Sequence, residues 1–221
     1  FSRDIGAMKK QEQWQIGNEI IESTESVLES DPENALAYAY RARAKNIFQD
    51  YEGAIEDSNK SLSISPKSNI AFYARAVSKQ LLGDLNGAIS DYSKALEIHP
   101  QHSPSYTNRG YAKSDSGDYQ GAISDYNKAL EINPKNGTAY LNRGLAKKKS
   151  GDYQGAISDF NKAIAINPQD ATAYNNRGGS KQMLGDNQGL CNDIKKAESL
   201  GSQEAAQWLN RKASIWCRNM R

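Results

Sequence analysis

Small, aromatic and apolar residues recur at helical spacing along most of the chain, with short polar breaks between the stretches. In residues 103–136 one such stripe ends at a Gly-Asp pair and a second stripe follows it. Spacings of three and four residues predict amphipathic helices, so this segment predicts two helices joined by a turn. The first stripe holds Tyr106, Gly110 and Ala112, and the second holds Ala122, Ile123, Tyr126, Ala129 and Leu130.

The same two-helix pattern repeats. Five of the six prolines stand 34 residues apart, at Pro32, Pro66, Pro100, Pro134 and Pro168. Residues 103–136 and 137–170 are identical at 22 of 34 positions, which indicates duplication. The register predicts five units, at 35–68, 69–102, 103–136, 137–170 and a degenerate 171–201.

Turn residues mark the helix ends inside each unit. A glycine able to adopt the left-handed conformation closes the first helix, and the aspartate after it caps the second. These pairs begin at Gly83, Gly117, Gly151 and Gly185. Asn34, Ser68, Asn136 and Asp170 stand where the next first helix needs a cap. His102 breaks this rule, and we expect Ser103, followed by Pro104, to cap there instead.

The repeat resembles the tetratricopeptide repeat (TPR). The resemblance rests on the 34-residue period, the small and aromatic positions, the Gly-Asp turn and the final proline, and the wording of the units is similar to bacterial, especially cyanobacterial, TPR proteins. It implies an all-α, right-handed superhelical solenoid of helical hairpins whose first helices line a concave groove. Tyrosines at the repeated aromatic positions are then core residues rather than ligands.

The ends depart from the repeat, as terminal units must face water. Residues 1–34 predict an N-terminal segment with a degenerate half-repeat, in which Ile20, Ile21, Val27 and Leu28 keep the register of a second helix. Residues 202–221 predict a capping helix and tail, with Ser202 as the cap and an apolar face at Ala205, Ala206, Trp208, Leu209 and Ala213.

Charged residues recur at fixed positions of the unit. The seventh residue is always arginine, the eleventh lysine and the twenty-third aspartate. Antiparallel packing of each hairpin brings the arginine and aspartate together, so we expect a ladder of internal ion pairs; a basic stripe that binds a ligand is the alternative. The pairs are Arg41 with Asp57, Arg75 with Asp91, Arg109 with Asp125, Arg143 with Asp159 and Arg177 with Asp193.

The resemblance also places a peptide-binding groove on the first helices. Its candidate residues are Tyr40, Arg43, Tyr73, Val77, Asn108, Tyr111, Asn142, Leu145 and Asn176. The row of Asn108, Asn142 and Asn176 offers donors and acceptors for an extended peptide backbone, with amides that we expect to be free. Asparagine as a simple consensus residue is the alternative. The Lys and Asn set that binds chaperone C-termini in some TPR domains is absent from the corresponding positions.

Composition excludes several other classes. The 28 Lys and Arg against 26 Asp and Glu give a charge of +2, too small for a dedicated nucleic-acid binder. No apolar run is long enough to insert in a membrane. We find no nucleophile with a base, no metal cluster and no phosphate loop, so we expect no enzyme activity and no cofactor. Cys191 and Cys217 predict either a disulfide or two idle thiols.

The sequence therefore predicts a non-catalytic interaction scaffold that holds a partner peptide or helix in its groove. Two alternatives stay open: a recognition domain of a larger enzyme or regulator, and a structural protein that self-associates through its apolar N-terminal half. A cytoplasmic location is favoured, although a chain that begins at Phe1 is also compatible with an exported or lumenal mature protein.

Overall fold

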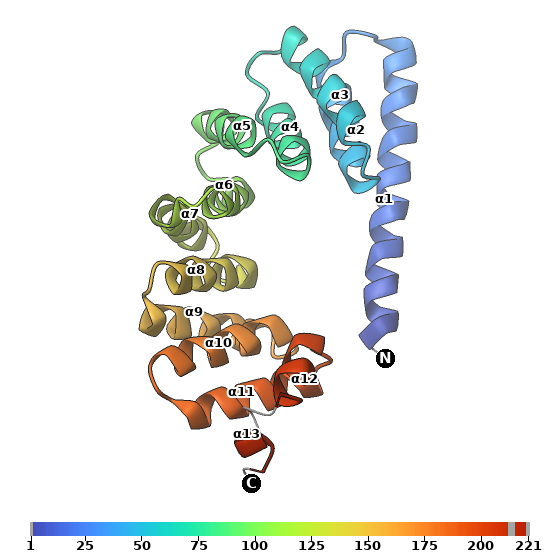
Figure 1. Ribbon diagram of the computed structural model, residues 1–221. Coiled ribbons are helices and arrows are strands. Elements are labelled where there is room, and N and C mark those ends of the chain that lie inside the picture. Colours follow the sequence, from blue (N-terminus) through green and yellow to red (C-terminus); the bar gives the residue numbers. More distant parts are fainter. Residues whose placement is uncertain (1, 212–214, 220–221) are drawn as a thin grey trace. The chain divides into compact units, whose positions relative to one another are not determined.

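The computed structural model describes residues 2–211 and 215–219, and every regular element within them is an α-helix. The chain divides into two compact units, residues 1–116 and 117–221. In each unit, helices adjacent in the sequence pack side by side (Figure 1). The predicted all-α fold of packed helical hairpins is confirmed.

The first unit holds six helices in its described residues: α1 (Ser2–Ser30), α2 (Ala35–Ile47), α3 (Tyr51–Ile64), α4 (Asn69–Leu81), α5 (Leu85–Ile98) and α6 (Ser103–Asp115). The second unit holds, within the residues described there, α7 (Tyr119–Ile132), α8 (Gly137–Lys149), α9 (Tyr153–Ile166), α10 (Ala171–Met183), α11 (Asn187–Ser199), α12 (Gln203–Leu209) and α13 (Ile215–Asn219).

The turn inside each hairpin has the predicted chemistry. The four predicted glycines have φ between +82° and +91°, and the aspartate after each accepts a hydrogen bond from the backbone N–H three residues later. In the first hairpin Gln49 occupies the glycine position with φ +65°. Residues other than glycine rarely adopt this left-handed backbone conformation, so Gln49 strains the turn between α2 and α3.

The expected cap of α6 is wrong. Ser103 is already the first helical residue, and His102 is the cap, with its Nδ1 accepting from the backbone N–H of Ser105 at 3.3 Å. The same nitrogen lies 2.7 Å from the Ser105 hydroxyl. Sequence reasoning overlooked that a neutral imidazole offers an acceptor nitrogen, as the oxygens of asparagine and aspartate do.

Small residues allow the helices of a hairpin to approach closely. Ala42 and Ala54 are fully buried together, as are Ala76 and Ala88. At Gly144 an added Cβ would lie 2.7 Å from the Phe160 ring, so only glycine fits this contact between α8 and α9. Buried rings at Tyr92, Tyr126 and Phe160 fill the rest of the interior, as predicted for the aromatic positions.

The predicted ion-pair ladder is confirmed within each unit. In α4 and α5, the Arg75 Nε and Nη2 donate to the two oxygens of Asp91, each at 2.8 Å, and Lys79 binds Oδ2 at 2.8 Å. The same three-residue cluster recurs in three further hairpins, around Asp57, Asp159 and Asp193. Arg109 and Asp125 belong to different units, so their pairing stays a prediction.

Each cluster is largely removed from water at its carboxylate. Asp91 is only 2% exposed, and burial alone would raise its pKa. The hydrogen bonds and positive charges of Arg75 and Lys79 outweigh burial and hold the pKa of Asp91 below its usual value. The Arg75 guanidinium also donates to Asn59 of the preceding hairpin at 2.6 Å, so the cluster joins neighbouring repeats.

The first helix is a single uninterrupted element. It has 29 residues against 13 in α2, and its N-terminal part extends beyond α2 (Figure 1). Gly17 lets the Phe48 ring lie against its backbone, since a Cβ there would come within 2.9 Å of the ring. Trp14 meets the same ring edge-on at 4.9 Å between centroids. Helix α1 is therefore fixed to the end of α2 by an aromatic contact.

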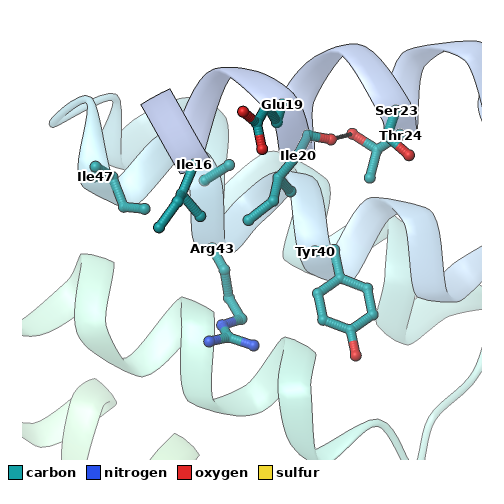
Figure 2. A pocket seen from close by; sticks show the side chains of 9 residues that line it. Ile16, Glu19, Ile20, Ser23, Thr24, Tyr40, Arg43 and Ile47 are labelled. Atoms are coloured by element: carbon teal, nitrogen blue, oxygen red, sulfur yellow. Dashed lines mark hydrogen bonds between the residues drawn. The ribbon is translucent and has the colours of Figure 1, made fainter. Parts of the chain in front are cut away.

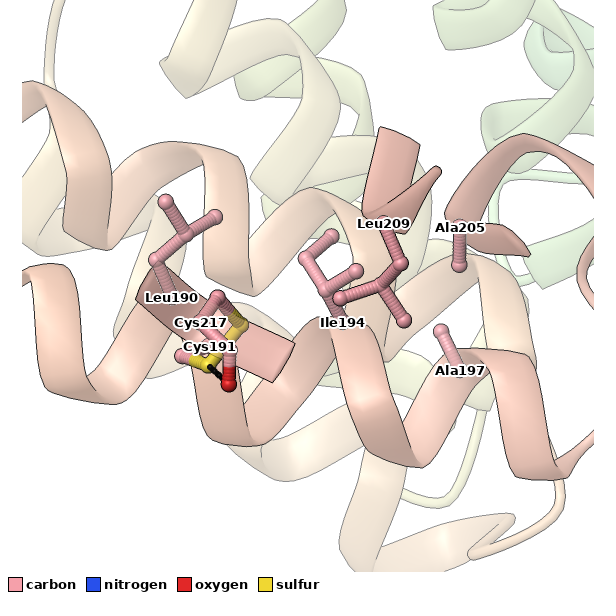
Figure 3. Packing of buried hydrophobic residues seen from close by; sticks show 7 residues of the cluster. All are labelled: Leu190, Cys191, Ile194, Ala197, Ala205, Leu209 and Cys217. Carbon is pink, nitrogen blue, oxygen red and sulfur yellow. Dashed lines mark hydrogen bonds between the residues drawn. A yellow bond between two sulfur atoms is a disulfide. The ribbon is translucent and has the colours of Figure 1, made fainter. Parts of the chain in front are cut away.

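Helix α12 covers α11, the second helix of the last hairpin. Ser202 caps α12 as predicted, and in the buried cluster Leu209 lies beside Ile194 of α11 while Ala205 faces Ala197 (Figure 3). The helix ends at Leu209, and the predicted apolar position Ala213 lies outside the described residues. Cys191 and Cys217 form a disulfide, with both residues buried. Of the two alternatives for these cysteines, the structure has the disulfide.

Candidate functional site

A cavity of the first unit lies between α1 and α2. It has a volume of about 560 Å³ and opens to solvent on one side. Ile16, Ile20 and Ile47 lie close together between the two helices, while Tyr40 and Arg43 project from α2 away from α1 (Figure 2). Glu19, Ser23, Thr24 and Ala44 complete the lining. The cavity thus combines an apolar wall with the Arg43 guanidinium, the Glu19 carboxylate and the hydroxyls of Ser23 and Thr24.

Arg43 also borders a second, smaller pocket in the same unit. This pocket, of about 130 Å³, is lined by Arg43, Asn69, Ile70, Tyr73, His102 and Pro104. Tyr73 packs edge-on against the His102 ring at 5.1 Å, and burial raises the pKa of Tyr73. Among the described residues no carboxylate lies within ion-pair distance of Arg43. Its guanidinium is therefore available to a ligand from either pocket.

The predicted asparagine row is only partly as expected. Asn108 donates through Nδ2 to the Tyr73 hydroxyl at 3.1 Å, and Asn176 donates to the Thr172 carbonyl and accepts from Lys148. The expectation of free amides is therefore wrong for both, because neighbouring side chains and the helix backbone satisfy them first. Within the described part of the chain, the Asn142 amide makes no side-chain hydrogen bond.

The other predicted groove residues differ in exposure. Val77 packs against the buried cluster of Ala76, Ala88 and Tyr92, so it belongs partly to the core. Tyr111 is 46% exposed on α6. In the second unit, Leu145 and Asn176 line a pocket of about 250 Å³ together with Lys148, Lys149, Tyr153 and Met183. Of the nine predicted residues, five line these three pockets: Tyr40, Arg43, Tyr73, Leu145 and Asn176. Val77, Asn108, Tyr111 and Asn142 line none of the three.

Sequence reasoning missed the contribution of α1. The apolar stripe of this segment was interpreted as a half-repeat with a second-helix register, which assigns Ile20 to packing and leaves Ile16 out. The apolar pair at i and i+4, Ile16 and Ile20, extends the stripe one turn before Ile20 and is the signal that marks the wall of the cavity. Lys148 was missed because the twelfth residue of the 34-residue repeat was not counted among the groove positions.

The described residues contain neither a metal cluster nor a membrane-spanning helix. No group of three or more His, Cys, Asp or Glu side chains there has an arrangement that could hold a metal ion. Among the helices of this part of the chain, none combines the length and apolarity that crossing a bilayer requires.

Comparison with known proteins identifies the repeat. Models of the tetratricopeptide repeat match residues 71–102, 92–124, 110–151 and 147–185. These matches together span residues 71–185, more than half of the 221 residues. A search of curated protein sequences gives no match.

Solved structures share the fold. The crystal structure of MamA is 24% identical with a TM-score of 0.69, over 75% of this chain and 96% of that chain. A MamA fragment from Desulfovibrio magneticus RS-1 is 18% identical with a TM-score of 0.70, over 78% and 96%. YrrB, described as a TPR protein with an unusual peptide-binding site, is 18% identical with a TM-score of 0.73, over 85% and 97%. The repeat matches and the shared fold of helical hairpins place this chain in the tetratricopeptide repeat family.

Proposed function

We propose that this chain, a TPR protein-interaction scaffold, binds a partner peptide or helix against the first helices of its N-terminal unit. The observation that carries the proposal is the cavity between α1 and α2, which exposes apolar side chains beside the Arg43 guanidinium. This guanidinium lies over the Tyr40 ring at 5.8 Å and has no carboxylate within ion-pair distance among the described residues. Ile16 is 53% exposed and Tyr40 37% exposed, so a partner gains contact area without unfolding anything. The described peptide-binding site of YrrB, a protein of the same fold, supports this use of the repeat.

The energetics of this pocket favour an amphipathic segment. Full burial of one partner Leu or Phe side chain gives about 1.5–3 kcal/mol, and the cavity has room for more than one. A partner carboxylate or carbonyl that pairs with Arg43 then fixes the orientation. Along the same face, Tyr73, Val77, Asn108 and Tyr111 follow on α4 and α6 as candidate contacts. Asn142, Leu145 and Asn176 are the candidate contacts on the second unit.

Peptide selection tests the proposal. A random peptide library displayed on phage is selected on the whole chain, and the affinity of a selected peptide is measured by titration calorimetry. Ile16→Asp places a charge in the apolar wall, and we expect a loss of affinity of about tenfold or more. Ile98→Asp is the matched control, because Ile98 is an exposed isoleucine of the same unit on a second helix. Equal affinity in both variants contradicts binding at this cavity.

Self-association is a second candidate, favoured by the exposed apolar residues of the first unit. Trp14, Ile16 and Leu36 are each more than half exposed. A second copy of the chain covering them would give a mass that rises with protein concentration in light scattering. A monomeric mass at all concentrations, together with peptide binding, supports the peptide-binding scaffold and contradicts self-association.

A further inference from the structure

The twelfth residue of a first helix makes side-chain hydrogen bonds to neighbouring helices in α2, α4 and α8. In α2 this residue is Asn46, which donates to the Ala74 carbonyl at 2.9 Å and accepts from the Ser78 hydroxyl at 2.7 Å. In α4 it is Gln80, which accepts from the Tyr92 hydroxyl at 3.0 Å. Both are neutral amides that are satisfied inside the protein. Asn46 thus joins its hairpin to the next one, whereas Gln80 joins the two helices of its own hairpin.

In α8 the same position holds a lysine, Lys148. Its Nζ donates to Asn176 Oδ1 on α10 at 3.1 Å, an amide oxygen rather than a carboxylate. Within the described residues no carboxylate lies within ion-pair distance of this ammonium. The adjacent Lys147 shows the contrast, because it pairs with the buried Asp159 at 2.9 Å.

Lys148 is half-buried, which makes an unpaired charge unfavourable. Burial lowers the pKa of Lys148, and attraction to Glu204 only partly opposes this. Glu204 is itself engaged, since it accepts a hydrogen bond from Asn175 at 2.7 Å. Two of the three ammonium N–H groups thus have no protein acceptor in the described residues.

The surroundings of Lys148 have room for a ligand. The pocket of about 250 Å³ has Leu145 and Met183 as apolar walls, and Lys149 and Tyr153 at its edge. The ammonium lies over Gly179, where an added Cβ would approach Nζ within 3.1 Å. Gly179 is the ninth residue of its repeat. The ninth residue of each preceding repeat is larger, as at Tyr111 and Leu145, so this glycine provides the space that Lys148 occupies.

We propose that this pocket binds a carboxylate of a partner protein segment, with the carboxylate on Lys148 and an adjacent apolar side chain against Leu145 and Met183. Two lysines line the pocket, but the Lys149 ammonium lies over the Tyr119 ring at 5.6 Å, which leaves Lys148 as the main charge for a ligand. One such ammonium, without an arginine fork among the lining residues, suits a carboxylate better than a doubly charged phosphate. The inference rests on the proposed function in that the partner is a protein, but it concerns a different pocket in a different unit.

The test uses small probes and the methyl signal of Met183, one of only three methionines. The whole chain is labelled with ¹³C at the methionine methyl groups and titrated with N-acetyl-aspartyl-leucine amide, whose only carboxylate is on a side chain. We expect a saturable shift with a Kd of about 1–10 mM. N-acetyl-leucine, which offers a terminal carboxylate instead, shows which source of carboxylate binds more tightly. Saturation by either probe supports the proposal.

Variants and a neutral probe establish the role of the charge. Lys148→Met should weaken the aspartyl probe at least fivefold by removing the charge, whereas Gly179→Ala, which shifts the flexible ammonium only slightly, should weaken it less. Gly179→Ala also favours the helix, so it keeps the protein folded. Lys162→Met, an exposed lysine of α9 away from the pocket, is the control and should change nothing.

Three results would overturn the proposal: equal binding of N-acetyl-asparaginyl-leucine amide, tighter binding of inorganic phosphate than of both carboxylate probes, or no saturation by either carboxylate probe below about 50 mM. Each is read at Met183 on the second unit. The outcome is therefore separate from whether Ile16→Asp affects peptide binding at the first unit.

Discussion

The ion-pair clusters between the helices of each hairpin make a quantitative prediction, best tested at Asp91. Asp91→Asn keeps the shape of the side chain but leaves Arg75 and Lys79 without the charge that they share. Breaking a buried pair by removing one partner costs about 3–5 kcal/mol. The cation side chains here are 17% and 24% exposed, so water partly compensates and we expect a loss of about 2–4 kcal/mol.

The assay is urea unfolding followed by circular dichroism, with thermal unfolding as a second measure. A loss of this size lowers Tm by about 5–12 °C in a protein of this length. Glu97→Gln, at an exposed carboxylate of the same helix, is the matched control and should stay within about 0.5 kcal/mol of the unchanged protein. If Asp91→Asn unfolds like the control, the clusters contribute nothing to stability and the reasoning is refuted.

The decrease in the free energy of unfolding at acidic pH provides an independent check on Asp91. Its pKa is lower in the folded chain than the usual 3.8, so its contribution is fully present above that value and is lost as pH falls below it. Asp91→Asn should therefore flatten the decline of stability below pH 4, measured as the free energy of unfolding at successive pH values. An unchanged decrease at acidic pH would contradict the depressed pKa.

Three further variants test other parts of the structure. Gln49→Gly should stabilise the first unit by about 0.5–1 kcal/mol in urea unfolding, because it relieves a left-handed conformation; destabilisation would contradict the strain. Burial, with His99 and Arg43 nearby, lowers the pKa of His102, so stability should fall as pH drops through 6.5, and His102→Asn should remove this pH dependence while keeping the cap. Replacing both Cys191 and Cys217 with alanine removes a bond that spans 26 residues, which should cost about 3 kcal/mol, and reductant should then have no further effect on Tm.

The hairpins could be predicted from the sequence because local chemistry determines them. A Gly-Asp turn, a capping residue and a stripe of small residues act within one 34-residue repeat, and each of these signals recurs in the next repeat. The Arg-Asp ladder followed from the same register, since antiparallel packing fixes which residues of a hairpin meet. The cap at His102 was missed because it depends on the protonation state of a side chain, which burial determines.

The pockets were less predictable because they depend on contacts between units of the repeat. The Asn108 amide is occupied by Tyr73 from the preceding hairpin, and no pattern within a single 34-residue repeat reveals this contact. The cavity beside Arg43 needs α1, whose sequence departs from the repeat. Lys148 became a candidate only when its neighbours Asn176 and Gly179 were seen together.

The central claim is that a partner segment binds the first helices of the N-terminal unit. A crystal structure of the chain with a display-selected peptide tests it most directly. The account predicts peptide density between α1 and α2, with apolar side chains against Ile16 and Ile20 and a polar group on Arg43. Density over the second helices α3 and α5, with the cavity beside Arg43 empty, would contradict it.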